Sequence, residues 1–235
     1  MEQTGKISVT KLNGNNAQYV DDVLVHEQRV SLLLGEKKIL ETICSPGMLR
    51  ELAYGHLLSN GRIHSPDEVT SVDVASNGRD IVVALADKPR PRSADLCVES
   101  RYTVRGEELL AAAHAGNSHG ELFRSTGGTH LAAIFPDAAP SIVVEDISRT
   151  CALEKALGKA LCAGVNFAQS LLFLTSRVPM GFVRTAAHAG IPILVAVSAP
   201  TYEAVREAER LGICLCGFAR GDRFNVYSQS WRVGQ

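Results

Sequence analysis

The sequence Ile191-Pro-Ile-Leu-Val-Ala-Val197 is a continuous apolar run, which is typical of a strand buried on both faces of a parallel sheet. A helix is predicted next, because Pro200 and Thr201 supply a start signal and Gly212 suits a left-handed C-terminal cap. Residues 213–218 form a second apolar run, so the unit is β-α-β with a right-handed crossover. We therefore predict an α/β fold around a buried sheet.

The second strand runs into Arg220-Gly-Asp-Arg223. Open α/β sheets bind ligands at the carboxyl ends of their strands, and guanidinium groups pair well with phosphates. A preceding strand, residues 171–174, leads into Thr175-Ser-Arg177, and Ser198 follows residue 197. Ser198 and Thr201 taken singly are better explained as helix caps. Their convergence with arginines and helix N-termini on one rim predicts a site for a phosphorylated ligand.

Composition limits the class of protein. The chain has 235 residues, a net charge of -1, 46% hydrophobic residues and 21% charged residues, as in ordinary globular proteins. This charge argues against non-specific nucleic-acid binding. No stretch approaches the roughly 18 apolar residues that span a bilayer, and the first residues do not resemble a signal peptide. We expect a cytoplasmic protein with neither a nucleic-acid nor a membrane partner.

The N-terminal part looks β-rich and different from the rest. Residues 20–34 and 38–43 predict a strand pair, and Ser45-Pro46 is expected to open a helix. The Asn77-Gly78 pair predicts a hairpin between two further strands. We divide the chain into a β-rich α+β part (1–95), a loop with a connecting helix (96–120) and an α/β domain (121–235).

Cysteine usage singles out one thiol. No Cys-x-x-Cys pair is present, so no structural zinc site or other metal site is predicted. Five cysteines are expected to act as small hydrophobic residues: Cys44, Cys151, Cys162, Cys214 and Cys216. Cys97 instead follows residues 87–95, whose prolines and charges predict an exposed loop. Arg92, Arg101 and Arg105 lie near it in sequence, and positive charge favours a reactive thiolate.

Paired glycines in Thr126-Gly-Gly-Thr-His130 precede another apolar run. They permit close approach of a ligand to the backbone, and His130 could donate a hydrogen bond or shuttle a proton. An ordinary turn with a structural histidine explains this pattern better.

Five ordered motifs resemble the FdhD/NarQ family of formate dehydrogenase accessory proteins. They are Thr126-Gly-Gly-Thr-His130, Glu145-Asp146 with Arg149 and Ala152-Leu-Glu-Lys155, Ser176-Arg177, Val197-Ser-Ala-Pro-Thr201, and Gly217-Phe-Ala-Arg-Gly-Asp-Arg-Phe-Asn-Val-Tyr227. The resemblance implies a cytidine-deaminase-like three-layer α/β/α sandwich with a mixed sheet, behind a smaller N-terminal α+β part. It also implies a cytoplasmic homodimer.

The resemblance further implies a sulfurtransferase that carries persulfide sulfur from a cysteine desulfurase to the cofactor of formate dehydrogenase. That cofactor is molybdenum bis(molybdopterin guanine dinucleotide). Cys97 would carry the persulfide, and the cofactor, or a GDP-like ligand, would bind six consecutive residues with Arg177 and His130 as further contacts. The six residues are Phe218, Ala219, Arg220, Gly221, Asp222 and Arg223.

Three stretches depart from the family pattern. Cys97-Val-Glu-Ser100 replaces a cysteine pair, Ser148-Arg-Thr-Cys151 replaces Gly-Arg-His-Asn, and Gly55-His-Leu57 replaces Gly-Phe-Leu. The alternative function is therefore a non-catalytic chaperone that binds a guanine nucleotide or the molybdenum cofactor. Deamination is not expected, because the zinc-binding motifs of deaminases are absent from the sequence.

Overall fold

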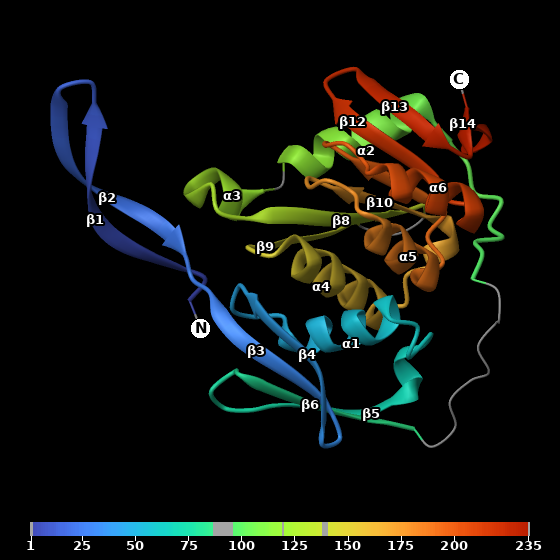
Figure 1. The fold of residues 1–235 in the computed structure, drawn as a ribbon, viewed down its shortest axis with the longest axis horizontal. Coiled ribbons are helices and arrows are strands. Elements are labelled where there is room, and N and C mark those ends of the chain that lie inside the picture. The colour runs from blue at the N-terminus through green and yellow to red at the C-terminus, as the bar shows by residue number, and fades with distance from the viewer. Residues whose placement is uncertain (1, 87–95, 119, 138–140, 235) are drawn as a thin grey trace.

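We analysed a computed structural model that describes residues 2–86, 96–118, 120–137 and 141–234. The predicted loop at 87–95, with Arg92, lies outside the described residues. Figure 1 shows a layered body with a β-hairpin that projects from one end. Among the described residues, no helix combines the length and the apolar character needed to cross a membrane.

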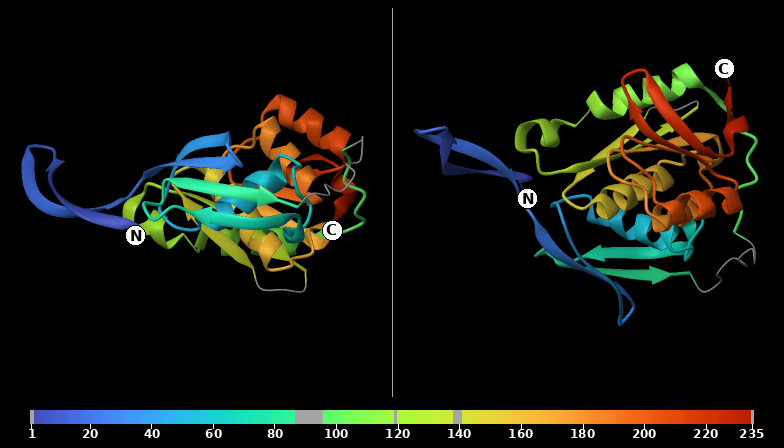
Figure 2. Two further views of the ribbon diagram at one scale, coloured as in Figure 1. Left: turned by 90° about the horizontal axis from the view of Figure 1, so that it is seen from below. Right: turned by 45° about the horizontal axis from the view of Figure 1, so that its top comes forward.

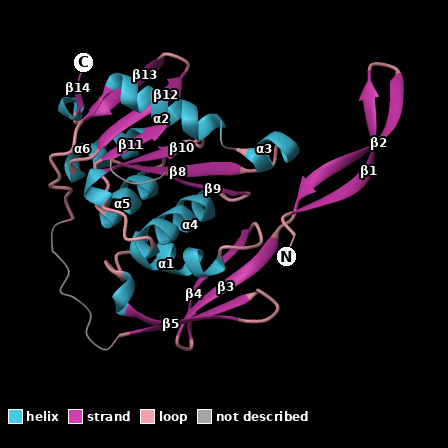
Figure 3. Ribbon diagram, turned by 180° about the vertical axis from the view of Figure 1, so that it is seen from behind, coloured by secondary structure: helices cyan, strands magenta, loops and turns pink. Residues whose placement is uncertain are grey.

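The projecting hairpin consists of β1 (Thr4–Asn13) and β2 (Asn16–Val25), which pair antiparallel along their full length. Figures 1 and 3 show it standing away from the sheets. Neither strand contains a buried residue, and the apolar side chains of Ile7 and Tyr19 are exposed. We expected a single strand over 20–34, and the structure corrects this: the chain leaves β2 at Val25 and begins a new strand at Gln28.

The N-terminal part continues as a four-stranded sheet in the order β4-β3-β6-β5. Its strands are β3 (Gln28–Leu34), β4 (Lys37–Cys44), β5 (Val69–Val74) and β6 (Asp80–Leu85). Both predicted hairpins, β3–β4 and β5–β6, are confirmed. Helix α1 (Leu49–Ser59) follows β4, and it begins three residues after the expected Pro46.

A six-stranded mixed sheet forms the C-terminal part, in the order β13-β12-β11-β10-β8-β9. Its strands are β8 (His130–Pro136), β9 (Ile142–Asp146), β10 (Ser170–Leu174), β11 (Ile193–Ala196), β12 (Cys214–Arg220) and β13 (Arg223–Ser228). Strands β10, β11 and β12 run parallel, as the apolar runs predict, and the other pairs are antiparallel.

Helices cover both faces of this sheet (Figure 2). One face packs on α4 (Arg149–Cys162), α5 (Met180–Ala189) and α6 (Tyr202–Leu211), and the other on α2 (Gly106–Ser118). Because side chains alternate along a strand, Leu172 and Leu174 join the first core, whereas Leu171 and Phe173 join the second. Thr201 caps α6 and Gly212 ends it in a left-handed conformation, so the predicted β-α-β unit is confirmed.

Short elements complete the chain. They are α3 (Glu121–Thr126), the 3-10 turns η1 (Pro66–Glu68), η2 (Phe167–Gln169) and η3 (Ser230–Arg232), and the paired strands β7 (Val104–Arg105) and β14 (Val233–Gly234). The connecting helix expected within residues 96–120 is α2, which starts at Gly106, after β7.

Helices α1 and α4 join the two parts of the molecule at very close range. A Cβ atom on Gly55 would lie 1.7 Å from the Glu154 carbonyl oxygen, and one on Gly158 would lie 1.9 Å from that of Glu51. Nearby, Lys155 Nζ lies 2.7 Å from Asp146 Oδ2 and donates to the Ser45 carbonyl, while Asp146 accepts the Ser45 N–H. The motif residues Asp146 and Lys155 are thus buried and tie the N-terminal part to the large sheet.

Candidate functional site

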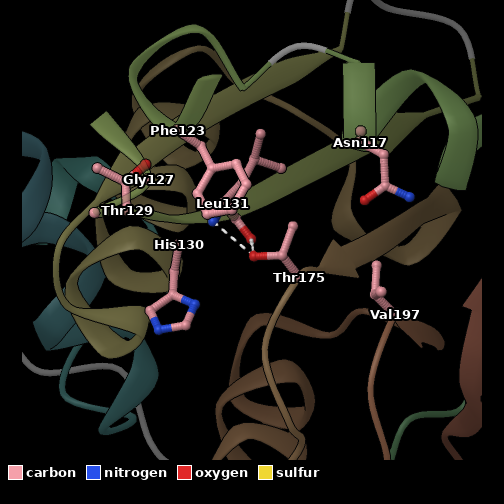
Figure 4. Close-up of a pocket in the computed structure, with 10 residues that line it drawn as sticks. Asn117, Phe123, Gly127, Thr129, His130, Leu131, Thr175 and Val197 are labelled. Carbon is pink, nitrogen blue, oxygen red and sulfur yellow. Dashed lines mark hydrogen bonds between the residues drawn. The ribbon is translucent and has the colours of Figure 1, made fainter. Parts of the chain in front are cut away.

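A cleft of about 520 Å³ lies at the rim of the large sheet where β10 and β11 end. Its lining comes from the end of α2, from α3, from the start of β8 and from the two strand ends (Figure 4). The lining residues are Gly116, Asn117, Phe123, Gly127, Gly128, Thr129, His130, Leu131, Thr175 and Val197. The cleft thus brings the paired glycines together with Thr175, which follows β10.

Hydrogen bonds between β8 and the end of β10 hold this rim. Thr175 Oγ1 accepts the Leu131 N–H at 2.9 Å, and the Thr175 N–H donates to the Leu131 carbonyl at 3.1 Å. Gly127 closes α3 with a φ of 66°, a backbone conformation that side chains with a Cβ rarely adopt. The turn after α3 can therefore bring the backbone of Gly128 and Thr129 to the cleft wall.

Glu145, on β9, holds in place the part of the cleft wall that Phe123 and Thr129 form. Its carboxylate accepts the N–H groups of Leu122 and Phe123 at the start of α3. It also accepts the Thr129 hydroxyl at 2.9 Å. One carboxylate thus orients both Phe123 and the glycine turn. Sequence analysis did not predict this role, since Glu145 is separated from these partners by 16 to 23 residues.

The Phe218–Arg223 segment lies beside the cleft. Arg220 Nε donates to the carbonyl of Val197, a lining residue, at 2.9 Å. The Phe218 N–H donates to the Ser198 carbonyl at 3.3 Å. Gly221 and Asp222 join β12 to β13 at a register in which Arg220 faces Arg223. Both guanidinium groups are exposed at the carboxyl end of β12, where we expected them.

This segment needs unusual backbone geometry. A Cβ atom on Gly217 would lie 2.9 Å from Pro200 Cδ and 3.1 Å from the Ser198 carbonyl oxygen, so only glycine fits there. Phe218 has a φ of 53°, although it is not glycine, and its ring is exposed. The side chain of Ala219 is buried in the core on the α2 side. Of these residues, Phe218, Arg220 and Arg223 therefore offer their side chains to a ligand, whereas Ala219 offers its backbone.

The other two predicted contacts lie on the same rim. His130 lines the cleft. Partial burial lowers its pKa, and the positive charge of Arg149 acts in the same direction, which favours the neutral ring, whose unprotonated nitrogen can accept a hydrogen bond. Arg177 is exposed in the loop that follows β10.

Cys97 is exposed, as expected. It lies at the end of the sheet where β12 begins, opposite the end that carries the cleft. Its Sγ atom is 3.7 Å from the position of a Cβ atom on Gly212, just before β12, and the Val98 N–H donates to the Leu211 carbonyl. Strand β12 has seven residues, which span about 20 Å at the usual rise. Figure 1 shows α3, which borders the cleft, and β14, near the Cys97 segment, at opposite ends of the sheet. Within one chain, Cys97 and Arg220 are therefore far apart.

Among the described residues, one cation near Cys97 was not predicted. Arg105 pairs with Glu107 and Glu108. Next to Cys97 in the chain, the Val98 carbonyl accepts from Arg232, which is 2% exposed and also donates to the carbonyls of Tyr102 and Gly212. Arg232 is 135 residues away in sequence, so proximity along the chain could not reveal it.

The remaining cysteines follow the expectation with one exception. Cys44, Cys151, Cys214 and Cys216 are buried, whereas Cys162 is exposed near the end of α4 and is not a core residue. Ser100, in the place of a second loop cysteine, donates to the Ala168 carbonyl at 2.6 Å and accepts the Tyr102 N–H. Its hydroxyl therefore fastens the segment after Cys97 to the protein body.

The chain is similar in sequence and in fold to known proteins. The sequence model of the FdhD/NarQ family matches residues 25–97 and 90–234. A sulfur carrier protein FdhD from Methanothermobacter thermautotrophicus is 32% identical over 80% of this chain and 82% of that protein. One from Mycolicibacterium paratuberculosis is 31% identical over the whole of both chains. The crystal structure of a candidate formate dehydrogenase accessory protein from Desulfotalea psychrophila superposes with a TM-score of 0.86, at 22% identity, over 99% of this chain and 100% of that chain.

Proposed function

Because this chain belongs to the FdhD/NarQ family, we propose that it is a sulfur carrier that serves formate dehydrogenase. The names of its relatives support the carrier role. The observation that carries the proposal for this chain is the exposed thiol of Cys97, which precedes Val98, whose carbonyl accepts from the buried guanidinium of Arg232. A sulfur carrier needs an accessible thiol, and Cys97 supplies one.

Cys97 would receive its sulfur from the persulfide of a cysteine desulfurase. The Cys97 thiolate attacks the outer sulfur of that persulfide, the S–S bond of the donor breaks, and the donor leaves as a thiolate. No external oxidant or reductant is needed for this exchange. The Arg232 charge would then stabilise the persulfide anion on Cys97.

The acceptor would be the molybdenum cofactor of formate dehydrogenase, which we treat as a substrate. Its phosphates suit Arg220 and Arg223, and the half-exposed ring of Phe218 offers a stacking surface. The cleft volume of about 520 Å³ falls in the usual range for one small-molecule site, roughly 300–1,000 Å³, so it suits one nucleotide-sized part of the cofactor. Delivery of sulfane sulfur as sulfide consumes two electrons, which a thiol reductant would supply.

The distance between Cys97 and Arg220 within one chain is a reason to consider a homodimer. A homodimer would allow the Cys97 segment of one subunit to approach the cleft of the other. We include a homodimer in the proposal for this reason, with cysteine desulfurase and formate dehydrogenase as partners.

Intact-mass spectrometry after incubation with a cysteine desulfurase and L-cysteine tests the carrier function. Wild type should gain about 32 Da, the mass of one sulfur atom, and lose it on reduction. Cys97→Ser should not gain this mass. Cys162→Ser is the matched control, because Cys162 is the other exposed cysteine, and it should load like the wild type. Loading that persists in Cys97→Ser would refute the assignment.

The alternative is a chaperone that binds the cofactor without covalent chemistry. It is favoured by Ser100 at the second loop position and by the distance between Cys97 and the cleft. In that case, GDP would bind to the wild type, but no sulfur would be gained from a desulfurase that loads a control acceptor.

A further inference from the structure

Two of the three stretches that depart from the family pattern meet at a second cavity. This cavity, of about 560 Å³, lies between α1, α4 and α5, which pack together (Figure 1). His56 of one departing stretch lines it, as do Arg149 and Thr150 of the other. Among the described residues, it shares no lining residue with the cleft at the rim of the sheet. Its volume suits a small molecule, for which sites measure roughly 300–1,000 Å³.

Glu154, which also lines this cavity, has a carboxylate oxygen without a partner. The residue is only 5% exposed. Its Oε1 atom lies 3.0 Å from His56 Nδ1 and accepts the Ser59 hydroxyl at 3.1 Å. In the part of the chain that the structure describes, Oε2 is a buried polar atom with no hydrogen bond. Native structures rarely leave a buried acceptor unpaired, because its desolvation is then not repaid. Oε2 therefore indicates a missing donor.

His56 makes this arrangement particular to the present sequence. The family pattern has phenylalanine at this position, and a phenyl ring offers no nitrogen to the Glu154 carboxylate. A buried polar pair is often no more stabilising than apolar residues of the same volume. Stability alone therefore does not account for a histidine here, whereas a ligand that needs the oriented carboxylate does.

Arg149 supplies the opposite charge on the same helix. Its guanidinium lies 5.7 Å from the centre of the Phe182 ring, and both residues line the cavity. Within residues 2–86, 96–118, 120–137 and 141–234, no salt bridge includes Arg149, so it does not pair with Glu154. Guanidinium groups pair preferentially with carboxylates and phosphates. The cavity thus presents a cation and a carboxylate oxygen that both lack a counter-charge.

The spacing of the two residues limits the size of a ligand that completes both. Arg149 is the first residue of α4, and Glu154 follows five residues later. The helical rise places their Cα atoms about 7.5 Å apart along the axis. A ligand that touches both side chains needs an ammonium and a carboxylate group close together, with a charge-assisted hydrogen bond of about 2.8 Å at each end.

We propose that this cavity binds a free α-amino acid. The ammonium group donates to Glu154 Oε2, and the carboxylate accepts from the guanidinium of Arg149. Leu153 and Phe182 provide an apolar part of the lining, so the side chain of the ligand is apolar. Leucine and alanine are the large and small representatives of this class. The proposal does not depend on the sulfur carrier function.

Calorimetric titration and thermal unfolding of the full-length protein test this site. The probes are L-leucine, L-alanine and two analogues of leucine: isopentylamine, which lacks the carboxylate, and isocaproate, which lacks the ammonium group. L-leucine at about ten times its Kd should raise the melting temperature by roughly 3–5 °C. Each analogue should bind at least about tenfold more weakly than L-leucine, since each loses one charge-assisted hydrogen bond.

Two variants separate the ends of the ligand. Glu154→Gln changes the shape little and removes the negative charge, so L-leucine and isopentylamine should both bind about tenfold more weakly. Arg149→Gln should weaken L-leucine by a similar factor but should not weaken isopentylamine, which has no carboxylate. This difference between ligands is not expected from a structural defect. Arg206→Gln, on the exposed face of α6, is the matched control and should bind like the wild type.

Four results would overturn the proposal. One is that neither L-leucine nor L-alanine binds at millimolar concentration, and another is that Glu154→Gln binds L-leucine as tightly as the wild type. Equal affinity for isocaproate and L-leucine would mean a plain anion site. Equal affinity for isopentylamine and L-leucine would mean a plain amine site. Melting temperatures of the unliganded variants show that each one is folded, and the comparison of the three leucine-like probes requires no variant.

Discussion

Glu145 Oε1 accepts the hydroxyl of Thr129 at 2.9 Å and also the N–H of Phe123 at 2.8 Å, so one oxygen atom joins β9, the glycine turn and α3. Because Thr129 and Phe123 both line the cleft, the shape of the proposed nucleotide site depends on a residue that does not line it.

Glu145→Gln should therefore weaken ligand binding more than it weakens the fold. The amide retains one acceptor oxygen, but it has no negative charge for the N–H groups at the start of α3. We expect a loss of about 1 kcal/mol in unfolding free energy, as for a helix cap, and about tenfold weaker GDP binding. Urea unfolding and calorimetric titration with GDP measure the two effects. Glu121→Gln, at an exposed position of the same helix, is the control. Equal GDP affinity in both variants would limit Glu145 to a structural role.

Arg220→Ala and Arg223→Ala should each weaken GDP binding, because charge-assisted hydrogen bonds to phosphate contribute about 1.5–3 kcal/mol. The affinity of both variants should also depend less on salt concentration than that of the wild type. Arg206→Ala, on the exposed face of α6, removes the same charge and should bind GDP normally. Since Arg220 also donates to Val197, Arg220→Lys separates charge from geometry. Unchanged binding in both alanine variants would exclude this segment from the site.

The sequence predicted the parts of the fold that follow from local pattern. Apolar runs without alternation identified β10, β11 and β12, and Gly212 marked the end of α6, because burial on both faces and a left-handed cap leave direct traces in sequence. The hairpin β1–β2 was not predicted. Its apolar residues face solvent and lack a regular period, so it has no signature of burial.

The candidate site was predicted only in part, for a related reason. Residues at strand ends, such as Thr175 and Arg220, could be placed on one rim because parallel strands end together. The contacts of Glu145 and Arg232 depend instead on how distant segments meet, and no local pattern encodes that. Cys97 and Arg220 likewise lie at opposite ends of β12 because the Cys97 segment packs beside Gly212, between α6 and β12. No local sequence pattern predicts that contact.

Gly158→Ala should destabilise the junction between α1 and α4. The added Cβ atom would lie 1.9 Å from the Glu51 carbonyl oxygen, so the helices must separate. Overpacking of this kind costs about 1–3 kcal/mol. Gly181→Ala on α5 is the control, because its added Cβ atom meets no atom within 4 Å and should be neutral or stabilising. Thermal unfolding compares them, and equal melting temperatures would show that the junction tolerates a wider spacing.

Glu207 should make the stability of the α5–α6 pair dependent on pH. Its side chain is buried, and it accepts hydrogen bonds from Arg210 and from Arg184 of α5. Hydrogen bonds from Arg210 and then from Arg184 lower the pKa of this carboxyl to about 2, against the effect of burial. Because the folded pKa lies below the unfolded value, the stabilisation is complete at neutral pH. It is lost as the pH falls from about 4.5 towards 2.

Glu207→Gln should thus lower the unfolding free energy at pH 7 by about 1 kcal/mol, a modest value because both arginines are half exposed to solvent. The difference from the wild type should stay constant down to about pH 4.5 and shrink below it, as the wild-type carboxyl gains a proton. Glu203→Gln, on the exposed side of α6, should show no such convergence. Thermal unfolding at several pH values from 7 to 2.5 measures this difference. A gap between wild type and Glu207→Gln that widens towards acid would mean that the neutral carboxyl, and not the carboxylate, stabilises the helix pair.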